Sequence, residues 1–211
     1  MARQGREPRS RRELNRRAHN FPKVHCIAMS SSSNPDSDDH DNSSLSNRTA
    51  LKMSEGVLLL NRQRAERADW DEIRGFLHRL SSRMPAPGFT VCVLSDAAIR
   101  RFNRRFRGLD KATDVLSFPA DEHREELEYL GDILISAETA RQNARRFGLR
   151  LEEEIELLSL HGVLHLLGHD HERDDGEMAR LERSWSKRLG LPQNLTGRAK
   201  PDAPKRRRLS R

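Results

Sequence analysis

Residues 151–171 read LEEEIELLSLHGVLHLLGHDH, and the rest of the chain is interpreted outward from this stretch. Its pattern predicts a long helix from about Leu151 to Gly168, with an acidic start that the helix dipole favours. His161 and His165 are four residues apart, so on a helix their rings project from one face, a turn apart. Two imidazoles placed in this way can share one ion.

The remaining histidines of this stretch complete the prediction of a metal site. Gly168 permits a sharp backbone turn that brings His171 back toward His161 and His165, giving three imidazoles and an open fourth coordination position. Three protein ligands plus water is the arrangement of a catalytic site, so we predict one Zn²⁺ per chain, although imidazole also accepts nickel, copper or iron. His169 lies on the turn, and we expect it beside the ligands or facing the substrate, with exchange against His171 as an alternative.

The same histidine spacing occurs in metzincin proteases, which place a glutamate directly after the first histidine as the general base. Here Gly162 occupies that position, and no Met-turn is evident nearby. A metalloprotease therefore stays an alternative function that lacks its base.

Around this stretch the hydrophobic pattern predicts strands mixed with helices. The strands are expected at 57–63, 89–94, 114–120 and 129–136, and the helices at 68–84, 95–106, 137–147, 151–168 and 174–189. This order favours a single α/β (α+β layered) domain, with one mixed sheet of about four strands, packed helices and the metal site at the end of a central helix. Ser95 and Ser136 are expected to cap the helices that follow them, and Gly148 and Gly190 to end helices.

The two ends of the chain differ in composition from the segment between them. Residues 1–52 pass from an Arg-rich stretch to a Ser- and Asp-rich one, and residues 193–211 end in PKRRRLSR, so both are expected to be disordered and to flank one domain at 53–192. The formal charge of +7 belongs to these ends, because residues 51–196 carry 23 basic and 25 acidic groups. The longest apolar run, Val57–Leu60, is far shorter than the roughly 20 residues that span a bilayer, so we expect a cytoplasmic protein with no membrane partner.

Three motifs, in order along the chain, resemble those of the YbeY family. HGVLHLLGHDH is similar to the family signature HGxLHLxGYDH, with His169 where the family usually has tyrosine. FNRRFRGLDKATDVLSFP, residues 102–119, resembles LNxxYRxKDxPTDVLSFP, and LGDILIS, residues 130–136, resembles LGDIxIS. Phe106 and Ala112 are mild departures, and the resemblance covers about Val57 to Leu191.

The resemblance implies a single-strand-specific, zinc-dependent endoribonuclease that acts in the maturation of 16S ribosomal RNA and in ribosome quality control. It implies the metal ligands His161, His165 and His171, a catalytic role for His161 and Arg107, and ribosomal RNA and the small ribosomal subunit as partners. A ribosome-assembly factor with a purely structural metal is the non-catalytic alternative.

Other residues of the matched motifs are weaker candidates. Arg104 and Arg105, with Arg107, could follow a phosphate backbone. Ser117 could line the cleft, and Asp132 could hydrogen-bond either a metal-bound histidine or a strand neighbour. Because aromatic residues make up 5% of the chain, backbone charge rather than base stacking should dominate RNA recognition.

Overall fold

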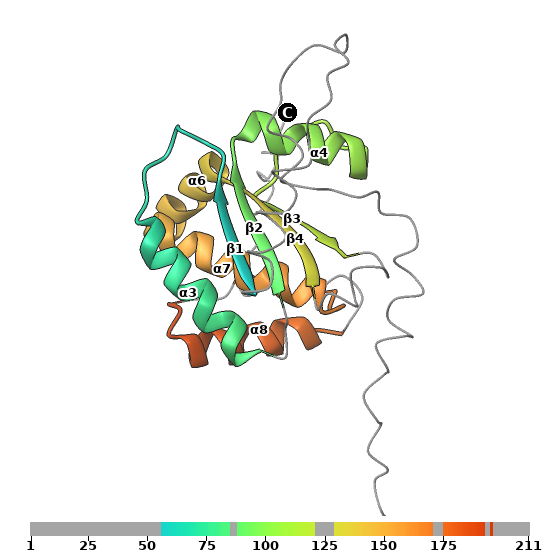
Figure 1. The fold of residues 1–211 in the computed structure, drawn as a ribbon. Helices are drawn as coiled ribbons and strands as arrows, with labels where there is room; N and C mark the ends of the chain where they lie inside the picture. Colours follow the sequence, from blue (N-terminus) through green and yellow to red (C-terminus); the bar gives the residue numbers. More distant parts are fainter. Residues whose placement is uncertain (1–55, 85–87, 121–128, 171–174, 193–194, 196–211) are drawn as a thin grey trace, which may run out of the picture.

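The computed structural model describes residues 56–84, 88–120, 129–170, 175–192 and 195. This part of the chain forms one mixed sheet with helices packed on it, as Figure 1 shows. The strands are β1 (Val57–Asn61), β2 (Gly88–Leu94), β3 (Val115–Pro119) and β4 (Tyr129–Ser136). They lie in the order β1-β2-β4-β3; β1, β2 and β4 are parallel, and β3 runs antiparallel along one edge. The predicted α/β domain with a mixed four-stranded sheet is confirmed.

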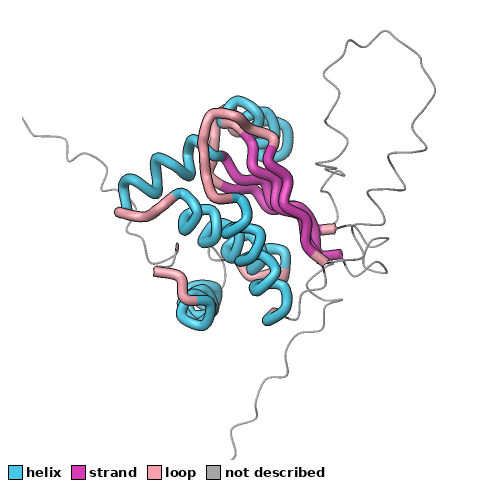
Figure 2. The backbone as a smooth tube through the Cα atoms, turned by 60° about the vertical axis from the view of Figure 1, so that its left-hand side comes forward, coloured by secondary structure: helices cyan, strands magenta, loops and turns pink. Residues whose placement is uncertain are grey.

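The helices divide unequally between the two faces of the sheet. They are α3 (Trp70–Arg83), α4 (Asp96–Arg107), α6 (Ala137–Phe147), α7 (Leu151–Leu166) and α8 (Glu177–Leu189). Figure 2 turns the sheet nearly edge-on and shows most of the helices on one side. On that side α3, α6, α7 and α8 contribute to one apolar cluster, whereas α4 packs in a second cluster on the other face.

The strand residues alternate between these two clusters, as the pleat of a strand requires. On β2, Val91 and Val93 face the larger cluster, and Cys92 and Leu94 face α4. Every residue of β2 is buried, because helices cover both faces of this inner strand.

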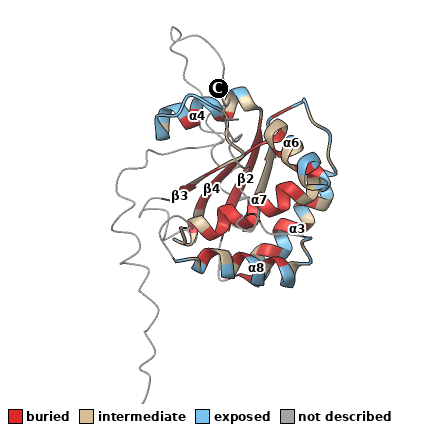
Figure 3. Ribbon diagram, turned by 180° about the vertical axis from the view of Figure 1, so that it is seen from behind, coloured by how far each residue is buried: buried red, intermediate tan, exposed pale blue. Residues whose placement is uncertain are grey.

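Helix α7 is the centre of the larger layer. It packs against α3, α6, α8, β3 and β4, and Figure 3 shows it buried along most of its length. A helix that is apolar nearly all round belongs in the interior of a domain, which agrees with the predicted central helix.

The helix ends follow the predicted capping residues. Ser95 and Ser136 accept backbone hydrogen bonds at the starts of α4 and α6, and Gly148 and Gly190 end α6 and α8 in the left-handed conformation. The two capped starts are also joined to each other, since Asp96 accepts hydrogen bonds from the hydroxyls of Ser136 and Thr139.

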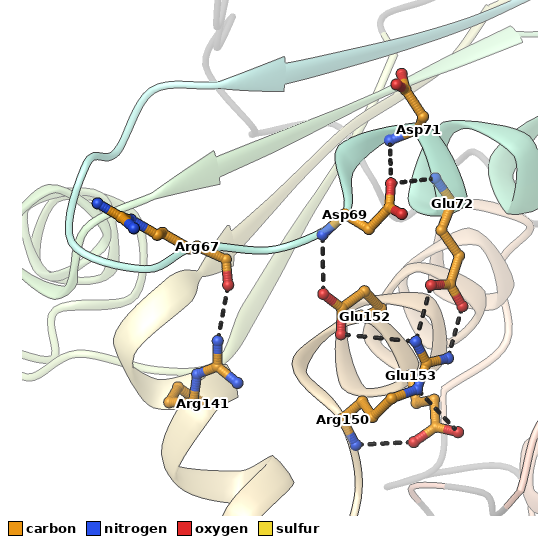
Figure 4. A network of polar contacts seen from close by, with 8 residues as sticks. All are labelled: Arg67, Asp69, Asp71, Glu72, Arg141, Arg150, Glu152 and Glu153. Carbon is orange, nitrogen blue, oxygen red and sulfur yellow. Dashed lines mark hydrogen bonds and ion pairs between the residues drawn. The ribbon is translucent and has the colours of Figure 1, made fainter.

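A polar network fastens the starts of α3 and α7 to each other (Figure 4). The Arg150 guanidinium donates two hydrogen bonds to the Glu72 carboxylate, at 2.8 and 2.6 Å. Glu152 accepts a hydrogen bond of 2.9 Å from the Asp69 backbone N–H at the start of α3. These groups are partly exposed, so each pair contributes about 1 kcal/mol or less and mainly fixes the relative register of the two helices.

The ends predicted to be disordered are residues 1–52 and 193–211, and all of them except Leu195 lie outside the described residues. Leu195, which the sequence assigns to the C-terminal tail, packs against the larger apolar cluster. None of the helices in the described ranges is long and apolar enough to span a membrane.

One acidic side chain of α7 lies inside this packing. Glu156 is only 6% exposed, and burial raises its pKa to about 7, with a smaller contribution from the nearby Glu72 carboxylate. Arg79 and Arg150 oppose this shift, and Glu153 adds to it. The folded state therefore binds a proton at Glu156 more tightly than the unfolded chain does.

We predict that Glu156→Gln stabilises the protein at pH 8 and has little effect at pH 4. Below the ordinary pKa of 4.5 the carboxyl is neutral in both states, and the folded state becomes less favourable as the pH rises from there through 7. The gain at pH 8 should be on the order of 2–3 kcal/mol, measured by urea unfolding at both pH values. Glu177→Gln, at an exposed position of α8, is the control, and an equal effect of Glu156→Gln at pH 4 and pH 8 would contradict the prediction.

Candidate metal centre

Helix α7 brings two of the three predicted ligands together. The Nε2 atoms of His161 and His165 lie 3.1 Å apart, and the two rings meet edge to face with their centroids 4.7 Å apart. His161 is 8% exposed, and His165 is half-buried. The pair therefore forms a polar spot at the boundary between the core and solvent.

This geometry fits a shared ion. Two nitrogens bound to tetrahedral zinc at 2.0–2.1 Å are separated by roughly 3.3 Å, close to the distance found between the Nε2 atoms. Neutral imidazole nitrogen is a preferred donor for zinc. Within the described ranges no group of three metal-ligating side chains is present, and the third predicted ligand, His171, lies outside those ranges.

The backbone after the pair turns back over the end of α7. Gly168 has φ +92°, its N–H donates to the His165 carbonyl, and the His169 N–H donates to the Leu164 carbonyl. These two bonds form a Schellman motif, which satisfies carbonyls that the helix end leaves without partners. The predicted break at Gly168 is thus present. The turn leaves His169 half-buried beside the helix end.

A carboxylate that the sequence analysis missed completes the surroundings of His161. Glu182 of α8 is fully buried, and its Oε1 lies 3.2 Å from His161 Nδ1, on the ring edge away from His165. The sequence did contain a signal that Glu182 is buried. It lies at helical spacing with the apolar residues Met178, Leu181 and Trp185, which is the position where an amphipathic helix faces the core.

Gly162, between the two histidines, sets how closely α7 approaches the sheet. A Cβ atom at this position would lie 2.7 Å from Ile133 Cγ2 and 3.0 Å from its Cδ1, so no larger side chain fits without movement. This is the position at which a metzincin carries its catalytic glutamate. The packing of α7 on β4 therefore leaves no room for a protease base there.

The two strand candidates lie on opposite faces of the sheet. Ser117 is paired with Ile133 and shares its face, on the side of α7 and the histidine pair. Asp132 lies on the other face, where its carboxylate accepts a 2.8 Å hydrogen bond from the Tyr129 hydroxyl. The hydrogen bond seen for Asp132 is thus to a neighbour on its own strand.

The arginine candidates are on α4, across the sheet from α7. Arg104, Arg105 and Arg107 are exposed, and Arg107 follows Phe106, whose ring packs edge-on against Phe118 of β3 at 5.1 Å between centroids. The carboxyl end of α4 therefore lies over the edge strand, and the structure does not place these arginines on the histidine face.

Arg100, which precedes these three arginines on α4, is paired with an acidic side chain. Arg100 donates two hydrogen bonds to Asp110, at 2.9 and 2.7 Å, and thereby holds the pKa of that carboxyl below its ordinary value. Arg104 approaches the same carboxylate at 3.9 Å. Asp110 therefore offsets charge at the Arg100 end of the group.

Comparison with known proteins gives consistent matches. The model of the family described as Endoribonuclease YbeY matches residues 61–190. The chain is similar to Endoribonuclease YbeY of Solibacter usitatus, with 51% identity over 128 residues, which are 60% of this chain and 83% of that protein. It is similar to Endoribonuclease YbeY of Helicobacter pylori at 44% identity over 117 residues, 54% of this chain and 81% of that protein. The solution structure of a Thermotoga maritima protein covers 70% of this chain and 99% of its own at 26% identity, with a TM-score of 0.43.

We predict that Gly162→Ala destabilises the fold by about 1–3 kcal/mol, because the added methyl group is forced against Ile133. Gly75→Ala in α3 is the matched control. Its Cβ would meet only the flexible end of Arg79, at 3.5 Å, so this change should stabilise the protein by roughly 0.5–1 kcal/mol. Urea unfolding of both variants measures the contrast, and equal effects at the two glycines would refute the close approach.

Proposed function

Because the chain belongs to the YbeY family of endoribonucleases, we propose that it is a zinc-dependent endonuclease that cuts single-stranded RNA. We further propose that its substrate is ribosomal RNA, that it acts on the small ribosomal subunit during 16S maturation and quality control, and that it works in the cytoplasm. The proposal that the activity depends on a metal is supported by one observation: His161 Nε2 and His165 Nε2 lie 3.1 Å apart on one face of α7.

In this proposal the two histidines hold the ion, and His171 supplies a third imidazole. A bound zinc ion supplies Lewis acidity and makes water a stronger nucleophile at neutral pH. The half-buried position of His165 supports the proposal, since an ion held there stays within reach of a substrate while the core shields the far side of the pair. Ser117 lies on the same face of the sheet, and we propose that it lines the path to the pair.

The proposed role of Arg104, Arg105 and Arg107 is to bind the RNA backbone. All three side chains are exposed on α4, and a guanidinium matches the geometry of phosphate oxygens. Arg105 lies over the Phe106 ring at 5.3 Å, which limits its freedom. Arg107 ends α4 and directly follows Phe106, whose ring packs on Phe118 of the edge strand β3, so we assign it the phosphate nearest the scissile bond.

If the metal had a purely structural role, substitution of its histidine ligands would have a different effect. His161 touches the core through Glu182, so loss of a structural ion should unfold the region around α7 and α8. A catalytic ion, by contrast, should be lost with the fold retained. Circular dichroism of the substituted proteins separates these two cases.

We predict that the purified protein carries about one zinc per chain and that His161→Ala and His165→Ala each lose it, because two imidazoles of the site stand on these residues. Elemental analysis measures the metal, and cleavage of a short single-stranded RNA measures activity. His78→Ala, at an exposed position of α3, is the matched control and should keep both. Full zinc content in both substituted proteins would show that the site is misassigned.

We also predict that Arg107→Ala lowers single-turnover cleavage at saturating protein by roughly a hundredfold, the scale seen when one donor to a developing oxyanion is removed. Arg107→Lys should recover little, since an ammonium group cannot form the paired hydrogen bonds of a guanidinium. Arg145→Ala removes the same charge from an exposed position of α6 and should leave the rate unchanged. A parental rate in Arg107→Ala would remove Arg107 from the catalytic machinery.

A further inference from the structure

The contact between Glu182 and His161 has features that the proposed function does not use. Met178, Glu182 and Ser186 are spaced by four on α8, and all three are buried on the face that packs in the core. Within this face the Glu182 carboxylate is fully buried, and its Oε1 lies 3.2 Å from His161 Nδ1. A buried carboxylate is costly unless it is paired, and the contact with His161 offsets part of this cost.

The chemistry of the two groups fixes which atom carries hydrogen. If the Glu182 carboxyl is ionised, it can only accept hydrogen bonds, and His161 Nδ1 is then the donor of this contact. In a neutral imidazole the other nitrogen then keeps its lone pair, and here that nitrogen is the Nε2 that faces His165. Metal ligation requires this unprotonated nitrogen.

We propose that Glu182 is a positioning residue that holds the ring of His161 and fixes its tautomer, so that Nε2 is ready to bind an ion. The inference deepens the proposed function, on which it rests for the identity of the ion as zinc. The carboxylate acts through His161 and does not itself reach the ion.

The first test needs neither a variant nor a metal. Long-range ¹⁵N–¹H spectra of the zinc-free, full-length protein report which ring nitrogen of each histidine is protonated. We expect hydrogen on Nδ1 of His161 and a lone pair on its Nε2. Hydrogen on Nε2 of His161 overturns the proposal.

The second test measures the dissociation constant for zinc by competition with a chromophoric chelator. Glu182→Met preserves the length of the side chain but removes the carboxylate and leaves only a thioether, which is a weak acceptor, so zinc affinity should fall roughly 10- to 100-fold. Glu182→Gln keeps one acceptor oxygen and should lose less. Ser186→Ala lies one turn further on the same buried face, where the hydroxyl has no hydrogen-bond partner among the described residues, and should match the parent.

Stability and affinity are compared in the same proteins. A fall in thermal stability with an unchanged zinc dissociation constant in both Glu182 variants would show that the carboxylate is structural and would overturn the proposal. These readouts are independent of RNA. A parent that binds zinc without cutting RNA refutes the proposed nuclease and leaves the role of Glu182 standing, and the tautomer spectra decide that role even if the parent binds no zinc.

Discussion

The close contact between Gly162 and Ile133 is the constraint on which the arrangement of the centre depends. With no side chain at position 162, α7 lies directly on β4, and the two histidines on either side of this glycine are carried to the boundary of the core. A bulkier residue would lift the helix from the sheet and move both rings with it. The same absence of a side chain leaves no protease base at this position.

Much of this arrangement could be predicted from the sequence, because it depends on local patterns. The four strands, the five helices, the serine caps and the turn at Gly168 follow from periodicity and from backbone preferences that act over a few residues. The shared face of His161 and His165 follows from helical spacing alone.

The rest could not be predicted, because it depends on which elements lie side by side. The contact of Glu182 with His161 joins residues that are 21 positions apart on two helices, and only the docking of α8 on α7 creates it. For Asp132 the sequence left two partners open, a metal-bound histidine or a strand neighbour. The alternation that buries Ile133 against α7 places Asp132 on the other face of the sheet, where it accepts a hydrogen bond from Tyr129. Similarly, Arg107 and Ser117 belong to one continuous motif in the sequence. In the structure, however, Arg107 lies on α4 on one face of the sheet, and Ser117 faces the opposite side.

The position of Glu182 on the last helix has a consequence for a chain that is only partly synthesised. The sheet and α7 precede α8 along the sequence, so a nascent chain that ends before α8 already contains His161 and His165 but not the carboxylate. Such a chain also leaves uncovered the side of α7 on which Met178 and Trp185 pack. A premature stop codon between α7 and α8 would therefore produce a chain that displays both imidazoles on an apolar surface, without the carboxylate that orients the first of them.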